Sequence, residues 1–169
     1  MTRTPVLTFT PEGIYCPAGD FYIDPWRRVA RALITHGHAD HSRWGMGSYL
    51  ATHDALPVMR HRLGDISAQG IAYGEQRVIG GATVSFHPAG HVPGSAQIRV
   101  EVDGEVWVAS GDYKVIDDGL SPPFEPVRCH HFITESTFGL PVFRWEAQDI
   151  VARQINDWWR SCAAAGKTA

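Results

Sequence analysis

The spacing of apolar and polar residues predicts a chain built mainly of short β-strands. Short apolar or alternating runs that end at glycine, proline or aspartate are typical of strands. Such runs occupy residues 6–10, 14–15, 21–23, 31–35, 49–52, 71–73, 76–79, 82–87, 96–102, 105–110 and 131–134. Asp103-Gly104, between two of these runs, predicts a tight hairpin, because both residues accept a positive φ.

Two other segments have the pattern and boundaries of helices. Residues 53–63 follow a cap at Thr52 or Asp54 and stop before Gly64. Residues 146–160 form an amphipathic helix. Its apolar side consists of Ile150, Val151, Ile155, Trp158 and Trp159. We expect the two tryptophans to pack in the core rather than to stack on nucleic-acid bases.

The strongest chemical signal directly follows the predicted strand at residues 31–35. Residues 36–41, the metal loop, read His-Gly-His-Ala-Asp-His. Imidazole suits divalent transition metals, and a carboxylate adds charge and oxygen ligation. In extended backbone His36 and His38 point to one side, and Asp40 and His41 fall in a helical turn expected at residues 40–45. We therefore expect two nitrogens for one ion, and a carboxylate and a nitrogen for a second, rather than a solvated histidine-rich loop.

The metal loop resembles the signature of the metallo-β-lactamase fold hydrolases, and most of the chain follows their order of motifs. The resemblance implies an α/β (α+β) fold, the αββα sandwich, and usually two divalent ions. It implies that His91, in the loop of residues 89–95, is a further metal ligand. It implies that Asp112 bridges both ions, and that Asp24 braces the metal loop through hydrogen bonds. Without the resemblance, these three would be ordinary loop and turn residues.

This resemblance divides the expected ligands between two ions. His36, His38 and His91 would bind the first ion, Asp40 and His41 the second, and Asp112 both, so that Asp40 and Asp112 also act in catalysis. Zinc suits the histidine-rich set, and manganese suits the added carboxylates. We expect His53, His61 and His87 to lie outside the site. Ser95 is expected to cap its own loop rather than to donate to a phosphate.

Glu135-Ser136-Thr137-Phe138-Gly139 resembles the motif that opens the β-CASP branch of this superfamily, with Phe138 where tyrosine is usual. That branch consists of DNA and RNA nucleases, and Glu135 matches its acidic, catalytic position. An acid at this place is also favoured without any resemblance, because it lies at the end of a strand and near the N-terminus of the next helix.

Residues 13–26 and 35–44 resemble a narrower bacterial family, the ligase-associated DNA exonucleases. The resemblance implies DNA end processing in repair, beside an ATP-dependent DNA ligase and a helicase. Its chemistry would be attack of a metal-activated hydroxide on a phosphodiester. Residues 1–169 would then form the N-terminal portion of a metallo-β-lactamase-like domain. The β-CASP segment, with further histidines, is expected beyond this chain.

Three other functions remain open from the sequence. An RNA-processing nuclease of the same branch would carry the same motifs. A thioester or lactam hydrolase is less favoured, because Glu135-Ser136-Thr137 would then have no role. A non-catalytic metal-binding fragment would expose an apolar face and self-associate.

Composition limits these functions only broadly. The chain has 169 residues, 44% hydrophobic and 20% charged, which is typical of one soluble globular domain. A net charge of −3 gives no support for nucleic-acid binding, although arginines cluster on both sides of the metal loop. Three widely spaced cysteines favour reduced thiols and a cytoplasmic protein. For these arginines a solvated surface is favoured over a local basic face; they are Arg27, Arg28, Arg31, Arg43, Arg60 and Arg62.

Overall fold

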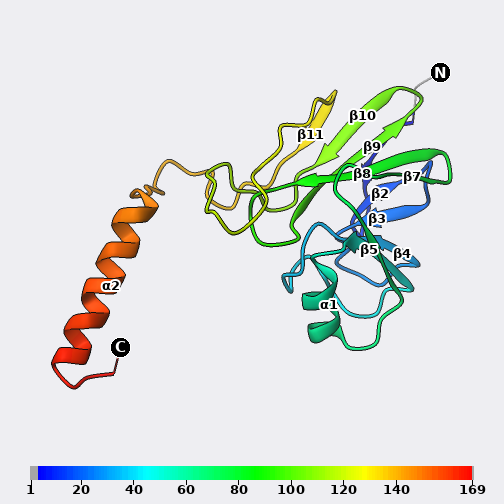
Figure 1. Cartoon of the computed structure of the whole chain (residues 1–169). Helices are drawn as coiled ribbons and strands as arrows, with labels where there is room; N and C mark the ends of the chain where they lie inside the picture. The colour runs from blue at the N-terminus through cyan, green and yellow to red at the C-terminus, as the bar shows by residue number, and fades with distance from the viewer. Residues whose placement is uncertain (1–3, 169) are drawn as a thin grey trace. The chain divides into compact units, whose positions relative to one another are not determined.

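Two β-sheets form the framework of the computed structural model, which describes residues 4–168 (Figure 1). The chain divides into two units, one ending at Glu135 and the other beginning at Ser136. Both sheets belong to the first unit. The predicted domain of residues 1–169 therefore contains two separate units, and its residues 1–3 and 169 lie outside the described part.

The first sheet has the strand order β1-β2-β3-β4-β5-β6. Its strands are β1 (Thr8–Phe9), β2 (Ile14–Cys16), β3 (Phe21–Ile23), β4 (Arg31–Leu33), β5 (Ser48–Thr52) and β6 (Ala68–Ile71). β1, β2 and β3 pair antiparallel, whereas β3, β4, β5 and β6 pair parallel. Because parallel strands end at the same edge of a sheet, the segments that follow β3 and β4 emerge side by side.

The second sheet has the order β11-β10-β9-β8-β7. Its strands are β7 (Gln76–Ile79), β8 (Ala82–Pro88), β9 (Ala96–Val102), β10 (Glu105–Ala109) and β11 (His131–Ile133). β8 and β10 both pair antiparallel with β9, and β11 pairs parallel with β10. β8, β10 and β11 therefore run in one direction, and the segments that follow them lie at one edge.

The two sheets pack face to face around one apolar core. Inward-facing side chains of both sheets share this core, among them Phe21, Ile23 and Leu33 from the first sheet and Phe86 and Ile98 from the second. The opposite face of the first sheet is covered by α1 (Leu56–Leu63) through a second cluster. Successive strand residues alternate between these two faces. Three layers result, α1 and two sheets, and the predicted mixed α/β fold is confirmed.

Most predicted strands lie within a residue or two of the observed ones, and residues 21–23, 76–79 and 96–102 match to the residue. The strand predicted at 71–73 is wrong: the strand is Ala68–Ile71, and Tyr73 makes only an isolated bridge to Phe86. β6 has no apolar alternation, and it exists because β5 offers it a parallel partner.

Both helices lie where the sequence predicts them, but some of the residues at which they begin and end differ from the prediction. α1 begins after Ala55, and no side chain caps it; Thr52 Oγ1 accepts a hydrogen bond from the N–H of Ala55 instead. Gly64, with φ 77°, ends it as predicted. In place of the helical turn expected at residues 40–45, one turn closes earlier, where the N–H of Ser42 donates to the carbonyl of His38 (2.8 Å), and residues 42–45 are irregular.

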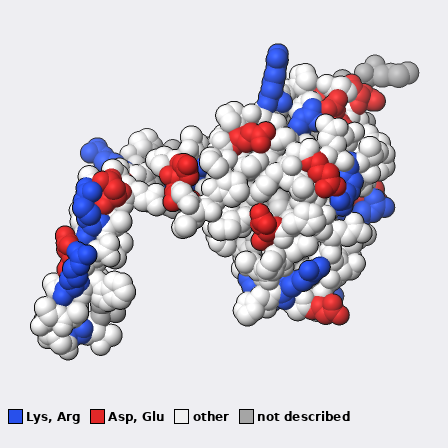
Figure 2. Space-filling view, in the orientation of Figure 1, with Lys and Arg blue, Asp and Glu red and all other residues white. Residues whose placement is uncertain are grey.

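The second unit contains α2 (Gln148–Ala164), which has no buried residue. Trp158 and Trp159 are 55% and 63% exposed, so the expectation that they pack in the core is wrong. α2 is the one helix among the described residues of its unit, and a single helix has nothing there to bury its apolar side. Figure 2 shows acidic and basic side chains together along one side of α2. No helix in residues 4–168 is long and apolar enough to cross a membrane.

Candidate metal centre

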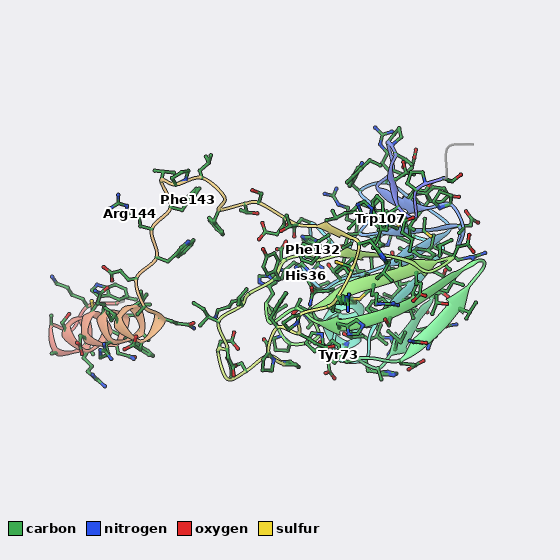
Figure 3. The ribbon with its side chains drawn as sticks, turned by 90° about the horizontal axis from the view of Figure 1, so that it is seen from above. His36, Tyr73, Trp107, Phe132, Phe143 and Arg144 are labelled. Carbon is green, nitrogen blue, oxygen red and sulfur yellow. The ribbon has the colours of Figure 1, made fainter. Side chains whose placement is uncertain are left out.

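The segments that follow β4, β8 and β10 meet at one edge of the sandwich. They bring together His36, His38, His91 and Asp112, called here the four-residue cluster. Each of these residues offers one ligand atom, and the four atoms all lie within 4.8 Å of one another. His36 lies inside the first unit, as Figure 3 shows, and its side chain has no exposed surface. The arrangement joins residues that are up to 76 positions apart in the sequence.

His36 is held as a neutral imidazole whose free nitrogen faces the cluster. The Thr35 hydroxyl donates its one proton to Asp24 Oδ2 (2.5 Å), so its oxygen accepts from His36 Nδ1–H (3.1 Å). The lone pair of Nε2 is thereby left for a ligand. Burial lowers the pKa of His36 to about 2, with help from His41 and the other site histidines. The ring therefore stays uncharged at any physiological pH.

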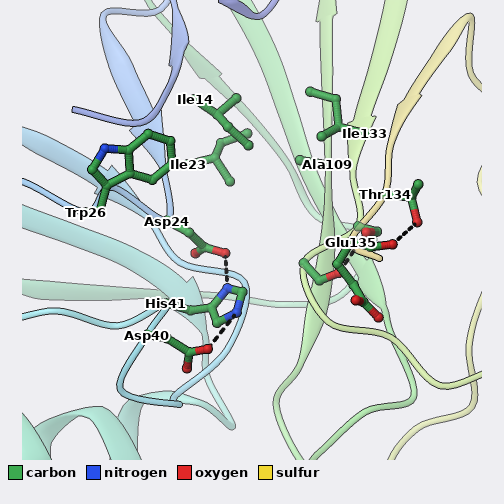
Figure 4. Close-up of a pocket in the computed structure, with 12 residues that line it drawn as sticks. Ile14, Ile23, Asp24, Trp26, Asp40, His41, Ala109, Ile133, Thr134 and Glu135 are labelled. Carbon is green, nitrogen blue, oxygen red and sulfur yellow. Dashed lines mark hydrogen bonds and ion pairs between the residues drawn. The ribbon is translucent and has the colours of Figure 1, made fainter. Parts of the chain in front are cut away.

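Three carboxylates lie near His41, those of Asp24, Asp40 and Asp112. Its Nδ1 donates to Asp24 Oδ2 (2.8 Å), and its Nε2 lies 3.2 Å from Asp112 Oδ1 and 3.6 Å from Asp40 Oδ2. Figure 4 shows the contacts with Asp24 and Asp40. Burial lowers the pKa of His41, but the hydrogen bond to Asp24 and the three carboxylate charges outweigh it and raise the pKa overall.

Asp24 ties the start of the metal loop to the end of β3. Besides the two side-chain contacts, its Oδ1 accepts a hydrogen bond from the backbone N–H of Thr35 (2.8 Å). Its own φ of 43° is left-handed, a conformation that aspartate tolerates better than most residues. This turn directs the carboxylate at Thr35 and His41, so that it orients the ring of His41 directly and the ring of His36 through the Thr35 hydroxyl.

The nitrogens of the cluster face one another closely. His38 Nδ1 lies 3.0 Å from His36 Nε2 and 3.3 Å from His91 Nε2. Burial lowers the pKa of His91, although Asp112 acts in the opposite direction. In the tautomers that leave a lone pair on each of these three nitrogens, the nitrogens repel one another unless a cation lies between them. The donor set of three imidazoles and one carboxylate therefore fits a divalent transition metal.

Asp112 lies between two groups of potential ligands. Its Oδ2 is 3.8 Å from His36 Nε2 and 3.7 Å from His91 Nε2, while its Oδ1 faces His41. The preceding residue, Gly111, has φ 55°, and a Cβ there would lie 2.6 Å from the side chain of Thr35. Only glycine allows β10 to end this close to the end of β4.

Ser95 fixes the loop that carries His91. Its Oγ accepts hydrogen bonds from the backbone N–H groups of His91 (3.1 Å) and Val92 (3.2 Å), as the sequence predicts for a loop cap. Thr52 donates to the carbonyl of Gly94 (2.6 Å), which attaches the same loop to the end of β5. The ring of His91 is thus positioned by its backbone.

The cluster does not include His53, His61, His87 or Glu135. His87 is in β8 and pairs with Glu125 (2.9 Å), as expected, and His53 and His61 are exposed. Glu135 is not part of the cluster. It lines a pocket next to His41, and its charge partly opposes the burial that lowers the pKa of His91.

Thr35 and Arg62 support the site, a role that the sequence did not predict for either of them. Thr35 could have been noticed, since a hydroxyl directly beside a ligand histidine is a usual partner for the second ring nitrogen. Arg62, from α1, donates to the carbonyls of Gly37 (2.6 Å) and Ser42 (3.4 Å). It lies 25 positions from Gly37, and no local pattern in the sequence indicates the contact.

Relatives of this chain process nucleic acids according to their names. No family model matches. A ribonuclease of Thermus thermophilus is 31% identical over 149 residues, which cover 70% of this chain and 34% of that protein. A probable DNA ligase of Opitutus terrae is 29% identical, covering 77% of this chain and 13% of that protein. An RNase J-like protein of Methanocaldococcus jannaschii is 33% identical over 49% of this chain and 20% of that protein.

The chain thus spans between 13% and 34% of the length of these relatives. Among solved structures, a metallo-β-lactamase of Cronobacter sakazakii is 17% identical with a TM-score of 0.40, covering 65% of this chain and 58% of that one. The sequence relatives confirm the resemblance to metallo-β-lactamase fold hydrolases that residues 36–41 indicated. Within that class, the sequence relatives include nucleases of the β-CASP branch.

Proposed function

We propose that this chain carries the metal centre of a nuclease that processes DNA ends. The observation that carries the proposal is the position of Asp112. One of its oxygens faces His36 and His91, and the other faces His41. A single carboxylate placed in this way can serve two ions at once, which is the arrangement suited to cleavage of a phosphodiester.

The proposed ligand sets follow from the same contacts. His36, His38 and His91 with Asp112 would bind one ion, and Asp40, His41 and Asp112 the second. Divalent ions at such a centre lower the pKa of water and stabilise charge on phosphate oxygens. Zinc and manganese both suit this mixture of nitrogen and oxygen donors.

The protein's own groups then have distinct tasks. Asp24 and Thr35 keep His36 and His41 in the tautomers that direct Nε2 into the site. Asp112 orients both halves of the centre. We propose Glu135 as the acidic group that moves a proton near the substrate, because it borders the pocket beside His41. Glu135 follows β11, which is a different strand from those that precede the proposed metal ligands.

DNA is the substrate that we favour. Supporting it are the similarity to a probable DNA ligase over 77% of this chain and the resemblance of residues 13–26 to ligase-associated exonucleases. A role in DNA repair in the cytoplasm, beside a ligase and a helicase, would follow. The second candidate is an RNA nuclease, which the ribonuclease of Thermus thermophilus and the RNase J-like protein favour.

The test is digestion of end-labelled single-stranded DNA, and of an RNA of the same sequence, by the purified chain with Mn²⁺ or Zn²⁺. We expect metal-dependent shortening of the DNA that is lost in His38→Ala and in Asp112→Ala. The matched control is His61→Ala, which removes an exposed histidine of α1 and should leave activity unchanged. Activity retained in Asp112→Ala would contradict the assignment.

Two other outcomes would redirect the proposal. Faster cleavage of the RNA would favour the RNA nuclease. If the chain binds metal, as counted by atomic emission, but cleaves neither substrate, the non-catalytic metal-binding alternative is favoured for this chain.

A further inference from the structure

A pocket opens beside the metal centre, where β3, β10 and β11 end (Figure 4). Its volume of about 230 Å³ is below the range of roughly 300–1,000 Å³ typical of sites for drug-sized ligands, so it suits one part of a nucleotide rather than a whole one. Asp40 and His41, from the proposed second ion site, form part of its lining. A nucleotide whose phosphate reaches the metal centre would therefore place its other parts at or near this pocket.

The walls of the pocket are mainly apolar. Trp26, Ile14 and Ile23 come from the first sheet and its loops, while Ala109 and Ile133 come from the second sheet. Figure 4 shows the two groups on opposite sides of the pocket. Two facing apolar walls, one of them aromatic, suit a flat and largely uncharged ring.

Trp26 is exposed and yet held in place. Its side chain is 45% exposed, but its indole Nε1–H donates to the carbonyl of Pro11 (2.8 Å). Its backbone N–H donates to the carbonyl of Glu12 (2.9 Å). Gly13 packs so closely that a Cβ there would lie 3.0 Å from Pro25 Cα. An aromatic ring fixed in advance loses little freedom when a ligand stacks on it.

The polar groups of the pocket disfavour a phosphate within it. Asp24, Asp40 and Glu135 all border the pocket, and each carries negative charge when ionised. The hydroxyl of Thr134 and the carboxylate of Glu135 can instead accept hydrogen bonds from amino groups at the edge of a base. The pocket is thus suited to a nucleobase, and the adjacent metal centre to the phosphate.

We infer that this pocket binds the nucleobase of the terminal nucleotide, with Trp26 as its stacking surface. The inference rests on the proposed nuclease function, which it extends from the phosphate to the base. Stacking on an aromatic side chain accepts any base, because every base has a π-face. Stacking on Trp26 would thus hold any base, whereas Thr134 and Glu135 would favour bases that carry an amino group.

The test measures base binding without metal and without cleavage. Deoxyadenosine is titrated into the metal-free chain, and 2-deoxyribose serves as the baseless control. The indole N–H signals are followed by nuclear magnetic resonance, with the Trp26 signal assigned from its loss in Trp26→Phe. We expect deoxyadenosine to shift the Trp26 signal and the methyl signals of Ile133, and deoxyribose to shift neither.

Two variants separate stacking from non-specific binding. In Trp26→Ala, binding followed at Ile133 should weaken roughly tenfold, and Trp26→Phe should recover part of it. The matched control is Trp44→Ala, which removes a 63% exposed tryptophan that does not line the pocket. It should leave binding unchanged.

Equal shifts with both ligands, or no shift at Trp26 and Ile133, would overturn the inference. Because this experiment needs neither metal nor turnover, such a result would leave the nuclease proposal standing. Conversely, a chain that cleaves no nucleic acid but binds deoxyadenosine at Trp26 would refute only the proposed activity.

Discussion

Asp24 and Thr35 show how a few contacts decide the chemistry of the site. The Thr35 hydroxyl has one proton, which it donates to Asp24, so it accepts from His36. The same carboxylate accepts from His41. Two ligand rings are therefore oriented by one acid and one alcohol, neither of which needs to touch a metal ion.

Thr35→Val removes the hydroxyl but keeps a side chain of nearly the same shape. We expect this variant to bind metal more weakly. Without the hydroxyl, His36 Nδ1–H loses its acceptor and its ring is free to turn. We expect affinity for Zn²⁺ to fall by about 10- to 100-fold, as is usual when such partners are removed. Competition with a chromogenic chelator would measure it. Thr35→Ser keeps the hydroxyl and should retain the affinity; equal weakening in both variants would argue against this role.

The close approach of Gly111 to Thr35 leads to a second prediction at the residue scale, which concerns stability. In Gly111→Ala a Cβ would lie 2.6 Å from the Thr35 side chain, so the ends of β10 and β4 must separate. Gly119→Ala is the matched control, since Gly119 also has a positive φ (71°) but nothing within 4 Å of the added atom. We expect Gly111→Ala to lower the free energy of unfolding by about 1–3 kcal/mol more than the control. Urea denaturation would measure the difference.

At the scale of elements, α1 supports both histidine loops. A Cβ on Gly37 would lie 3.0 Å from Val58, and one on Gly94 would lie 2.4 Å from the backbone of Ala55. Arg62 adds its hydrogen bond to Gly37, between the ligands His36 and His38. One short helix therefore fixes the distance between two loops that are far apart in the sequence.

Arg62→Ala should consequently reduce metal affinity without unfolding the chain. The carbonyl of Gly37 would lose its donor, and the metal loop would be held less firmly. We expect an approximately tenfold weaker affinity for Zn²⁺. Arg60→Ala is the control, because Arg60 lies on the same helix but donates to Ala68, away from the metal loop. Calorimetric titration with Zn²⁺ would measure the affinity of both variants. Equal affinities would contradict the prediction.

The sequence predicted where strands and helices lie better than it predicted which of them pair or pack together. The strands with strong alternation, such as residues 96–102, and the hairpin at Asp103-Gly104 were predicted correctly. β6 was not, because its residues become a strand only by pairing with β5. Trp158 and Trp159 were misjudged for a related reason. Amphipathic spacing identifies an apolar face, but whether another element covers that face depends on the rest of the fold.

At the scale of the whole molecule, the division after Glu135 separates the proposed site from α2. All proposed metal ligands, Asp24 and the pocket lie in the first unit. A chain shortened to end at Glu135 should therefore bind as many metal ions as the full chain, with an affinity within about a factor of three. Metal counting and chelator competition on both proteins would test this. Loss of metal from the shortened chain would mean that residues 136–168 contribute to the centre.

The sequence by itself determined the chemical groups and their local order. His-x-His-x-Asp-His places four potential donors within six residues, and this local order is a property of the sequence alone. Only the tertiary structure decided that His91 and Asp112 meet those donors, that Thr35 and Arg62 hold them, and that Trp26 faces Ile133 across a pocket. The physical reason is that these contacts depend on strand direction and on the packing of two sheets. Both arise from burying an apolar core, which no single stretch of residues specifies.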